Sequence, residues 1–104
     1  MVEIWREILE LPEYEVSNTG FVRNKKTGRI LKGYLNRPGG YLKINVDSKR
    51  LYVHRLVFET FGRYLRDSER VMFLDGNHEN TCINNLYASE KGYRYLEDPW
   101  EDFY

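Results

Sequence analysis

The hydrophobic periodicity of this chain changes near its middle, and that change limits the folds open to it. The segment "YLKINV" places Leu42, Ile44 and Val46 on one face and polar residues on the other, which predicts a half-buried strand. The apolar spacing then becomes helical near residues 54–61, on a face that holds Val53, Leu56, Val57, Thr60 and Phe61. Gly62 follows as a good helix terminator. A mixed α+β fold is therefore predicted.

Short strands are predicted before this switch. After a break at Pro12, the alternation of residues 14–16 indicates a strand with Glu15 facing solvent. Residues 21–23 and 29–31 flank "NKKTG", a turn with the glycine chemistry of a β-hairpin. We therefore expect small antiparallel sheets and hairpins in this part of the chain.

The segment after the helix is predicted to contain a strand, a loop and a second helix. Residues 71–74 are apolar and predict a buried strand, which the turn at residues 75–77 ends. Residues 78–88 are expected to form a polar loop with short apolar anchors. A last helix is predicted to begin at Ser89 and Glu90 and to end before Pro99.

Composition excludes several classes of protein. The 104 residues suffice for one domain, and 41% hydrophobic with 31% charged residues is typical of a globular chain. No apolar run approaches the roughly 20 residues that cross a bilayer, and the acidic N-terminus "MVEIWREILE" is not a signal peptide. Cys82 is the single cysteine, so an internal disulfide is excluded, and a small buried apolar role is expected for it. The cytoplasm of a bacterium or an infected cell is the expected setting.

Charge is divided unevenly along a chain whose formal net charge is zero. Residues 1–16 carry one basic and five acidic side chains. Residues 17–65 carry eleven basic and two acidic side chains, and residues 66–104 carry four basic and nine acidic ones. A basic central block of this kind is suited to binding phosphates. The alternative is a solvated surface whose charges scatter over several faces. The candidate DNA contacts are Arg23, Lys25, Lys26, Arg29, Lys32, Arg37, Lys43, Lys49, Arg50 and Arg55.

Three ordered motifs run through most of the chain. The first holds Trp5, then Tyr14, Val16, Ser17, Asn18, Gly20, Val22 and Arg23. The second is a Gly-Tyr pair followed by Val-His-Arg-Leu-Val at residues 53–57. The third holds Asp75, Gly76, Asn77, Asn80, Asn85 and Leu86.

Taken together, these motifs resemble the HNH homing endonucleases of phages and bacteria, over about residues 3 to 96. The resemblance implies a NUMOD-type β-rich module at residues 1–50 and an HNH-like ββα region at residues 51–96. In that family a hairpin, a loop and a helix surround one divalent cation such as Mg²⁺. The family's Asp-His-x-Asp-Gly-Asn motif supplies a metal ligand and the general base that activates water.

The resemblance fails at the residues that carry this chemistry. Met72 and Phe73 stand where the family has its Asp-His pair, and Arg94 falls close to a metal-ligand position on the last helix. Neither Met72 nor Phe73 can bind a hard cation or accept a proton, and an arginine opposes a bound cation. The resemblance therefore implies a degenerate site with no catalytic residue and no metal cofactor. Members of the family commonly continue into helical DNA-recognition segments, and none is expected in this sequence. A site-specific homing enzyme is therefore a poor fit.

Nearby polar residues leave one alternative open, a nuclease whose site has been rebuilt. Its candidates are Asp75, His78 and Asn80, with Asn85 beside them. An Asp in an Asp-Gly-Asn turn more often caps backbone amides, and His78 is expected to be a solvent-facing loop residue that no neighbour positions. His54 is expected to be a packed structural histidine rather than a base.

The C-terminal residues 97–104 suggest a second class of function. This tail mixes acidic residues with aromatic ones, and its expected partner contacts are Trp100, Glu101, Asp102, Phe103 and Tyr104. The leading hypothesis is a catalytically degenerate HNH-like protein that binds double-stranded DNA. The alternatives are a small inhibitor of a host or defence protein that acts through this tail, and the rebuilt nuclease.

Overall fold

A computed structural model describes residues 2–35 and 37–90 of the chain. In chain order the elements are β1 (Trp5–Ile8), β2 (Leu11–Ser17), β3 (Val22–Asn24), β4 (Ile30–Leu31), β5 (Lys43–Val46), β6 (Lys49–Tyr52), α1 (Val53–Phe61), β7 (Glu69–Phe73), the 3₁₀ helix η1 (Ile83–Asn85) and β8 (Leu86–Glu90). No helix among the described residues is long and apolar enough to cross a membrane.

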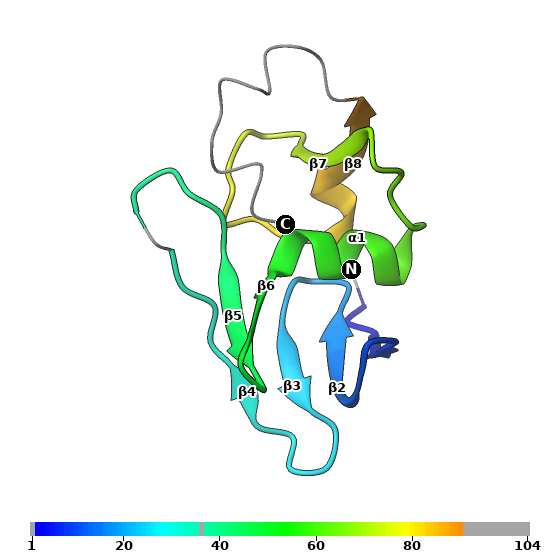
Figure 1. The fold of residues 1–104 in the computed structure, drawn as a ribbon, viewed down its shortest axis with the longest axis vertical. Coiled ribbons are helices and arrows are strands. Elements are labelled where there is room, and N and C mark those ends of the chain that lie inside the picture. Colours follow the sequence, from blue (N-terminus) through cyan, green and yellow to red (C-terminus); the bar gives the residue numbers. More distant parts are fainter. Residues whose placement is uncertain (1, 36, 91–104) are drawn as a thin grey trace.

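The described strands form three small antiparallel sheets, ordered β1-β2-β3-β4, β5-β6 and β7-β8. Helix α1 crosses the middle of the molecule, with β1 to β6 on one side and the β7–β8 ribbon on the other (Figure 1). This arrangement confirms the predicted α+β class. The strand-to-helix switch, the hairpin around "NKKTG" and the strand before Asp75 are also confirmed.

Three predictions about secondary structure were wrong. The predicted loop at residues 78–88 ends early, because η1 occupies Ile83–Asn85 and β8 begins at Leu86. Pro12 does not interrupt a strand, because β2 runs through it at a place where the ladder needs no amide from residue 12. Ser89 and Glu90 do not begin a helix; they end β8, which pairs with β7 from Phe73↔Leu86 to Glu69↔Glu90. Since five residues give little periodicity, only the neighbouring strand identifies β8. The rest of the predicted helix, residues 91–98, lies outside the described residues.

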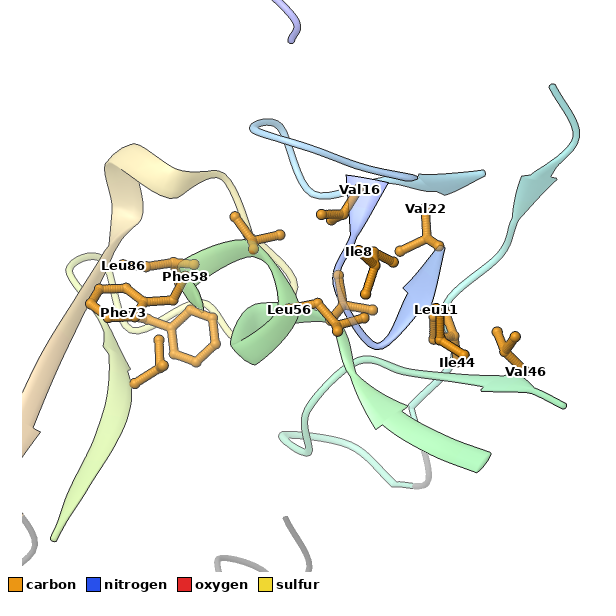
Figure 2. Close-up of a cluster of buried hydrophobic side chains, with 13 residues drawn as sticks. Ile8, Leu11, Val16, Val22, Ile44, Val46, Leu56, Phe58, Phe73 and Leu86 are labelled. Atoms are coloured by element: carbon orange, nitrogen blue, oxygen red, sulfur yellow. The ribbon is translucent and has the colours of Figure 1, made fainter. Parts of the chain in front are cut away.

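Helix α1 is buried on two sides, which explains why the core is continuous. Val53 and Val57 are almost inaccessible, and Leu56 and Phe58 are also buried. In Figure 2, Leu56 lies between a cluster from the N-terminal sheets and a second cluster that contains Phe58, Phe73 and Leu86. The helix therefore joins both halves of the molecule through apolar burial.

Glycines allow two close approaches in this core. The amide of Gly62 donates to the Phe58 carbonyl at 2.7 Å, and a Cβ on Gly62 would lie 2.7 Å from that oxygen. Gly62 thus ends α1 as predicted, by close contact rather than by a left-handed backbone, since its φ is −111°. Gly20 has a φ of +100° and packs against Thr81, where a Cβ would clash with the threonine hydroxyl.

Asn18 connects the N-terminal sheet to the segment that carries the family's third motif. Its side chain is 7% exposed; Oδ1 accepts from the Ile4 amide at 2.9 Å, and Nδ2 donates to the Val2 carbonyl at 2.9 Å. Its backbone carbonyl accepts from the Ile83 amide at 2.8 Å. One buried residue therefore fixes the chain near the N-terminus, the turn after β2 and the start of η1.

Replacing Asn18 with alanine should destabilise the fold by about 1–3 kcal/mol, because both side-chain hydrogen bonds are lost at a buried position. Urea unfolding followed by circular dichroism measures this change. Asn84→Ala is the matched control, since Asn84 is exposed and its stability effect should stay within about 0.5 kcal/mol. Equal effects of the two substitutions would contradict the role given to Asn18.

Candidate functional site

The loop after β7 is held together by the carboxylate of Asp75. This carboxylate accepts from Asn80 Nδ2 at 2.9 Å, from the Asn77 amide at 2.8 Å and from Asn85 Nδ2 at 2.8 Å. Asn85 Oδ1 in turn accepts from the Asp75 amide at 3.1 Å. The hydrogen bonds from Asn80, Asn77 and Asn85 lower the pKa of Asp75. The structure thus brings Asp75, Asn80 and Asn85 together as a turn network whose oxygens are already engaged.

Four aromatic rings meet where β5, α1, β7 and this loop converge. Tyr41 stacks on His78 with ring centroids 4.4 Å apart and on His54 at 4.9 Å. Phe73 lies 4.9 Å from His78 and 5.2 Å from His54. We call Tyr41, His54, Phe73 and His78 the ring cluster. Its rings fill the space beside the Asp75 loop with apolar and aromatic contact.

The expectation that no neighbour positions His78 was wrong. The residue is half-buried, its ring is stacked between its neighbours in the ring cluster, and its Nδ1 lies 2.9 Å from the Gly39 carbonyl oxygen. Gly39 and Tyr41 are far from His78 in sequence, so local patterns gave no sign of these contacts. His78 therefore belongs to a packed surface rather than to a solvated loop.

His54 is fully buried at the inner edge of the ring cluster, as a packed structural histidine should be. Burial, with smaller contributions from the nearby His78, Arg55 and Arg70, lowers the pKa of His54 to about 3. The imidazole is therefore neutral at physiological pH, and its ring contacts Tyr41, Tyr52 and Phe73.

The residues at the predicted metal position do not fit a divalent cation. Phe73 is buried in the ring cluster, and Met72 is half-buried with its sulfur accepting from Arg70 Nε at 3.1 Å. Neither side chain offers an oxygen ligand, and the carboxylate oxygens of Asp75 already accept hydrogen bonds from amide groups. Within residues 2–35 and 37–90 no three His, Cys, Asp or Glu side chains gather as a metal site. Arg94 lies outside the described residues.

Basic residues of the β3–β4 hairpin are partly neutralised within the molecule. Arg23 donates to Glu15 at 3.0 Å and covers the Trp5 ring at 3.9 Å, so Glu15 does not simply face solvent. Lys25 pairs with Glu7 at 2.6 Å. The other basic residues of this hairpin are exposed: Lys26, Arg29 and Lys32.

The remaining basic candidates lie around β5, β6 and α1. Arg37, Lys49 and Arg50 are exposed, whereas Arg55 is half-buried and donates to Glu59 at 3.3 Å. Lys43 was expected to be a surface contact, but only 9% of it is exposed, and its Nζ lies 5.1 Å from the Tyr52 ring centroid. The β5–β6 register explains this burial, since it places Lys43 directly opposite Tyr52.

Two other predictions have different outcomes, one wrong in degree and one untested. Cys82 is half-buried rather than fully buried. The predicted partner contacts Trp100, Glu101, Asp102, Phe103 and Tyr104 lie outside the described residues, so they remain predictions.

Comparisons with known proteins agree with this architecture. Residues 3–47 match the NUMOD4 motif. An uncharacterized HNH endonuclease of Acanthamoeba polyphaga mimivirus, L245, is 39% identical over 89 residues, 83% of this chain and 27% of that protein. The DNA endonuclease I-HmuI of Bacillus phage SP01 is 34% identical over 87 residues, 79% of this chain and 49% of that protein. The solved structure of I-HmuI, described as an HNH homing endonuclease that binds and cleaves DNA, matches with a TM-score of 0.75 and 30% identity over 95% of this chain and 59% of that one.

These matches support the HNH homing endonuclease family for this chain. It spans 27% and 49% of the lengths of the two curated relatives, so the activity of those whole proteins does not transfer with the family assignment. The Asp75 network holds the turn that the third motif predicted; the replacement of the family's catalytic pair by Met72 and Phe73 stays a prediction.

The buried His54 gives this fold a specific pH dependence. Its folded pKa of about 3 lies below the ordinary 6.5, so only the unfolded state takes up the proton between these values. Stability should be full above pH 6.5 and should fall as the pH drops toward 3, by at most about 1.4 kcal/mol per pH unit.

Urea unfolding at several pH values between about 6.5 and about 5.5 measures this slope. The carboxylates of Asp75 and Glu69, whose folded pKa values are lowered, add to it mainly at lower pH, because their ordinary pKa values are 3.8 and 4.5. His54→Gln should remove the slope whatever its absolute stability, and His54→Phe offers a second test should the glutamine fold poorly. A variant that keeps the wild-type slope would contradict the assignment to His54.

Proposed function

We propose that this chain is a catalytically inactive HNH protein that binds double-stranded DNA without cleaving it. The observation that supports the proposal is the ring cluster, in which Phe73, at the position where the resemblance implies the general base, packs against His54 and His78. A phenyl ring cannot accept a proton from water, and it excludes the hydrated cation that the reaction needs.

The geometry around Asp75 supports the same conclusion. Its carboxylate accepts three hydrogen bonds from Asn77, Asn80 and Asn85, so a cation would have to displace donors that stabilise the loop. Nδ1 of His78 lies 2.9 Å from the Gly39 carbonyl oxygen, and its ring stacks on Tyr41. The described residues contain no cluster of His, Cys, Asp or Glu side chains that could hold a metal ion and its bound water. The rebuilt nuclease is therefore the weaker reading, and no metal cofactor is proposed.

DNA is the proposed partner because the scaffold of a DNA endonuclease family is kept together with a basic central block. Each phosphate that a lysine or arginine neutralises releases condensed counterions, which favours binding at low salt. The related proteins come from a phage and a giant virus, which supports a setting inside an infected cell, where such DNA is present.

The first test is the fluorescence anisotropy of a labelled duplex titrated with the whole chain at about 50 and about 150 mM salt. Binding should weaken steeply with salt and should be the same in Mg²⁺ and in EDTA, because no metal takes part. A supercoiled plasmid incubated with Mg²⁺ should stay uncut. If the wild-type protein nicks the plasmid and His78→Ala abolishes that nicking, the proposal of inactivity is wrong and the rebuilt nuclease is favoured.

The acidic aromatic tail supports one alternative function, the inhibition or redirection of a host or defence protein. Residues 97–104 combine Trp100 and two other aromatic residues with four carboxylates, a composition suited to a basic groove on a protein. Deleting residues 97–104 should then abolish capture of host protein from lysate and leave the circular dichroism melt unchanged. Capture by the deleted chain that equals wild type would rule out this role for the tail.

A further inference from the structure

The turn between β5 and β6 holds two side chains in a conformation that glycine adopts more easily. Val46 pairs with Lys49, so Asp47 and Ser48 are the two central residues of this hairpin turn. Their φ angles are 49° and 66°, the only positive values at non-glycine residues in the described part of the chain. Positive φ at both positions is typical of a type I′ turn, which favours Asn-Gly because a side chain there crowds the backbone. The turn is therefore strained.

The β3–β4 hairpin shows how a turn of this chain avoids such strain. Its positive φ, 74°, falls on Gly28. Asn24 Oδ1 accepts from the Lys26 amide at 2.9 Å and from the Thr27 amide at 3.0 Å. Thr27 Oγ1 in turn accepts from the Arg29 amide at 3.2 Å. The polar side chains of that turn thus hold its own backbone, and a glycine takes the left-handed conformation.

The polar side chains of the β5–β6 turn have no such structural use. The exposed residues there are Asp47, Ser48, Lys49 and Arg50. Within residues 2–35 and 37–90, no hydrogen bond or ion pair holds any of these four side chains. Figure 1 shows the turn at the end of the β5–β6 ribbon that is remote from α1. Contacts within the described fold therefore do not explain why the strained side chains are present, and they are available to a ligand.

The chemistry of these four side chains fits the edges of base pairs. Lysine and arginine donate to the O6 and N7 acceptors of guanine, a carboxylate accepts from the amino group of cytosine, and a serine hydroxyl pairs with either kind of group. A phosphate would repel the carboxylate of Asp47, so contact with the DNA backbone alone does not account for this residue. The major groove of a duplex admits a two-stranded ribbon, which is the shape of this hairpin.

We propose that the β5–β6 turn enters the major groove of duplex DNA and reads base pairs through the side chains of residues 47–50. The inference rests on the proposed function and adds which element gives the chain a sequence preference. Val46, beside the turn, is 4% exposed and anchors the ribbon in the core, so the fold holds the turn in place. The exposed Lys26 and Arg29 of the β3–β4 hairpin then add affinity without base recognition.

The test begins with selection of bound duplexes from a random library by the wild-type chain, which should recover a short shared motif. Anisotropy then gives the ratio of the affinities for the motif and for a scrambled duplex. Lys49→Ala/Arg50→Ala should lower this ratio at least about tenfold, because base contacts are lost. Lys26→Ala/Arg29→Ala is the matched control, with an equal loss of charge at exposed positions. It should weaken binding to both duplexes alike and keep the ratio.

Asp47→Asn/Ser48→Gly supplies a readout that a merely structural turn would not give. The variant has the residues that a type I′ turn prefers, so its melting temperature should rise by about 4 °C while the ratio falls. A gain in stability with an unchanged ratio would overturn the inference, as would an unchanged ratio in the Lys49/Arg50 variant. A wild-type chain that binds duplex but recovers no motif would overturn it and leave the proposed function standing. A wild-type chain that binds no duplex at low salt would overturn both.

Discussion

The buried amide of Asn18 is the contact on which the rest of the molecule depends. It bonds to the backbone near Val2 and Ile4, and its carbonyl accepts from Ile83, so three segments distant in sequence meet at one residue. The close contact of Gly20 with Thr81 reinforces this junction. Since η1 begins here and follows the Asp75 loop, these contacts attach the end of that loop to the N-terminal sheet.

The residues of the Asp75 loop and those at the expected catalytic positions are held by different contacts. The hydrogen bonds of Asp75 with Asn80 and Asn85 hold the loop whether or not a metal is bound, so folding itself preserves them. Met72 accepts a hydrogen bond from Arg70, and Phe73 packs against His54 and His78 in the ring cluster. The proposed loss of catalysis rests on this packing at the two positions where the family resemblance implies an acid and a base.

The basic residues also differ from one another in the contacts that they make. Arg23 pairs with Glu15 and Lys25 pairs with Glu7, so their charges are paired within the fold. Lys43 has only 9% of its surface exposed and lies against the Tyr52 ring, so it is not the surface contact that the sequence predicted. Counting charges along the sequence treats all of these residues alike; only their partners distinguish a structural role from a binding role.

The sequence by itself determined the features that depend on near neighbours. The switch from strand to helix before α1, the glycine hairpin and the Asp75 turn follow from local periodicity and backbone preference, and the ordered motifs indicated the family. The tertiary structure decided what depends on distant partners: β8 exists because β7 pairs with it, His78 is fixed by Tyr41 and Gly39, and Lys43 is buried by its register with Tyr52. The reason is that strand pairing, ring stacking and hydrogen bonds join residues that are distant in sequence, such as His78 and Gly39, 39 positions apart, and no local pattern records these contacts.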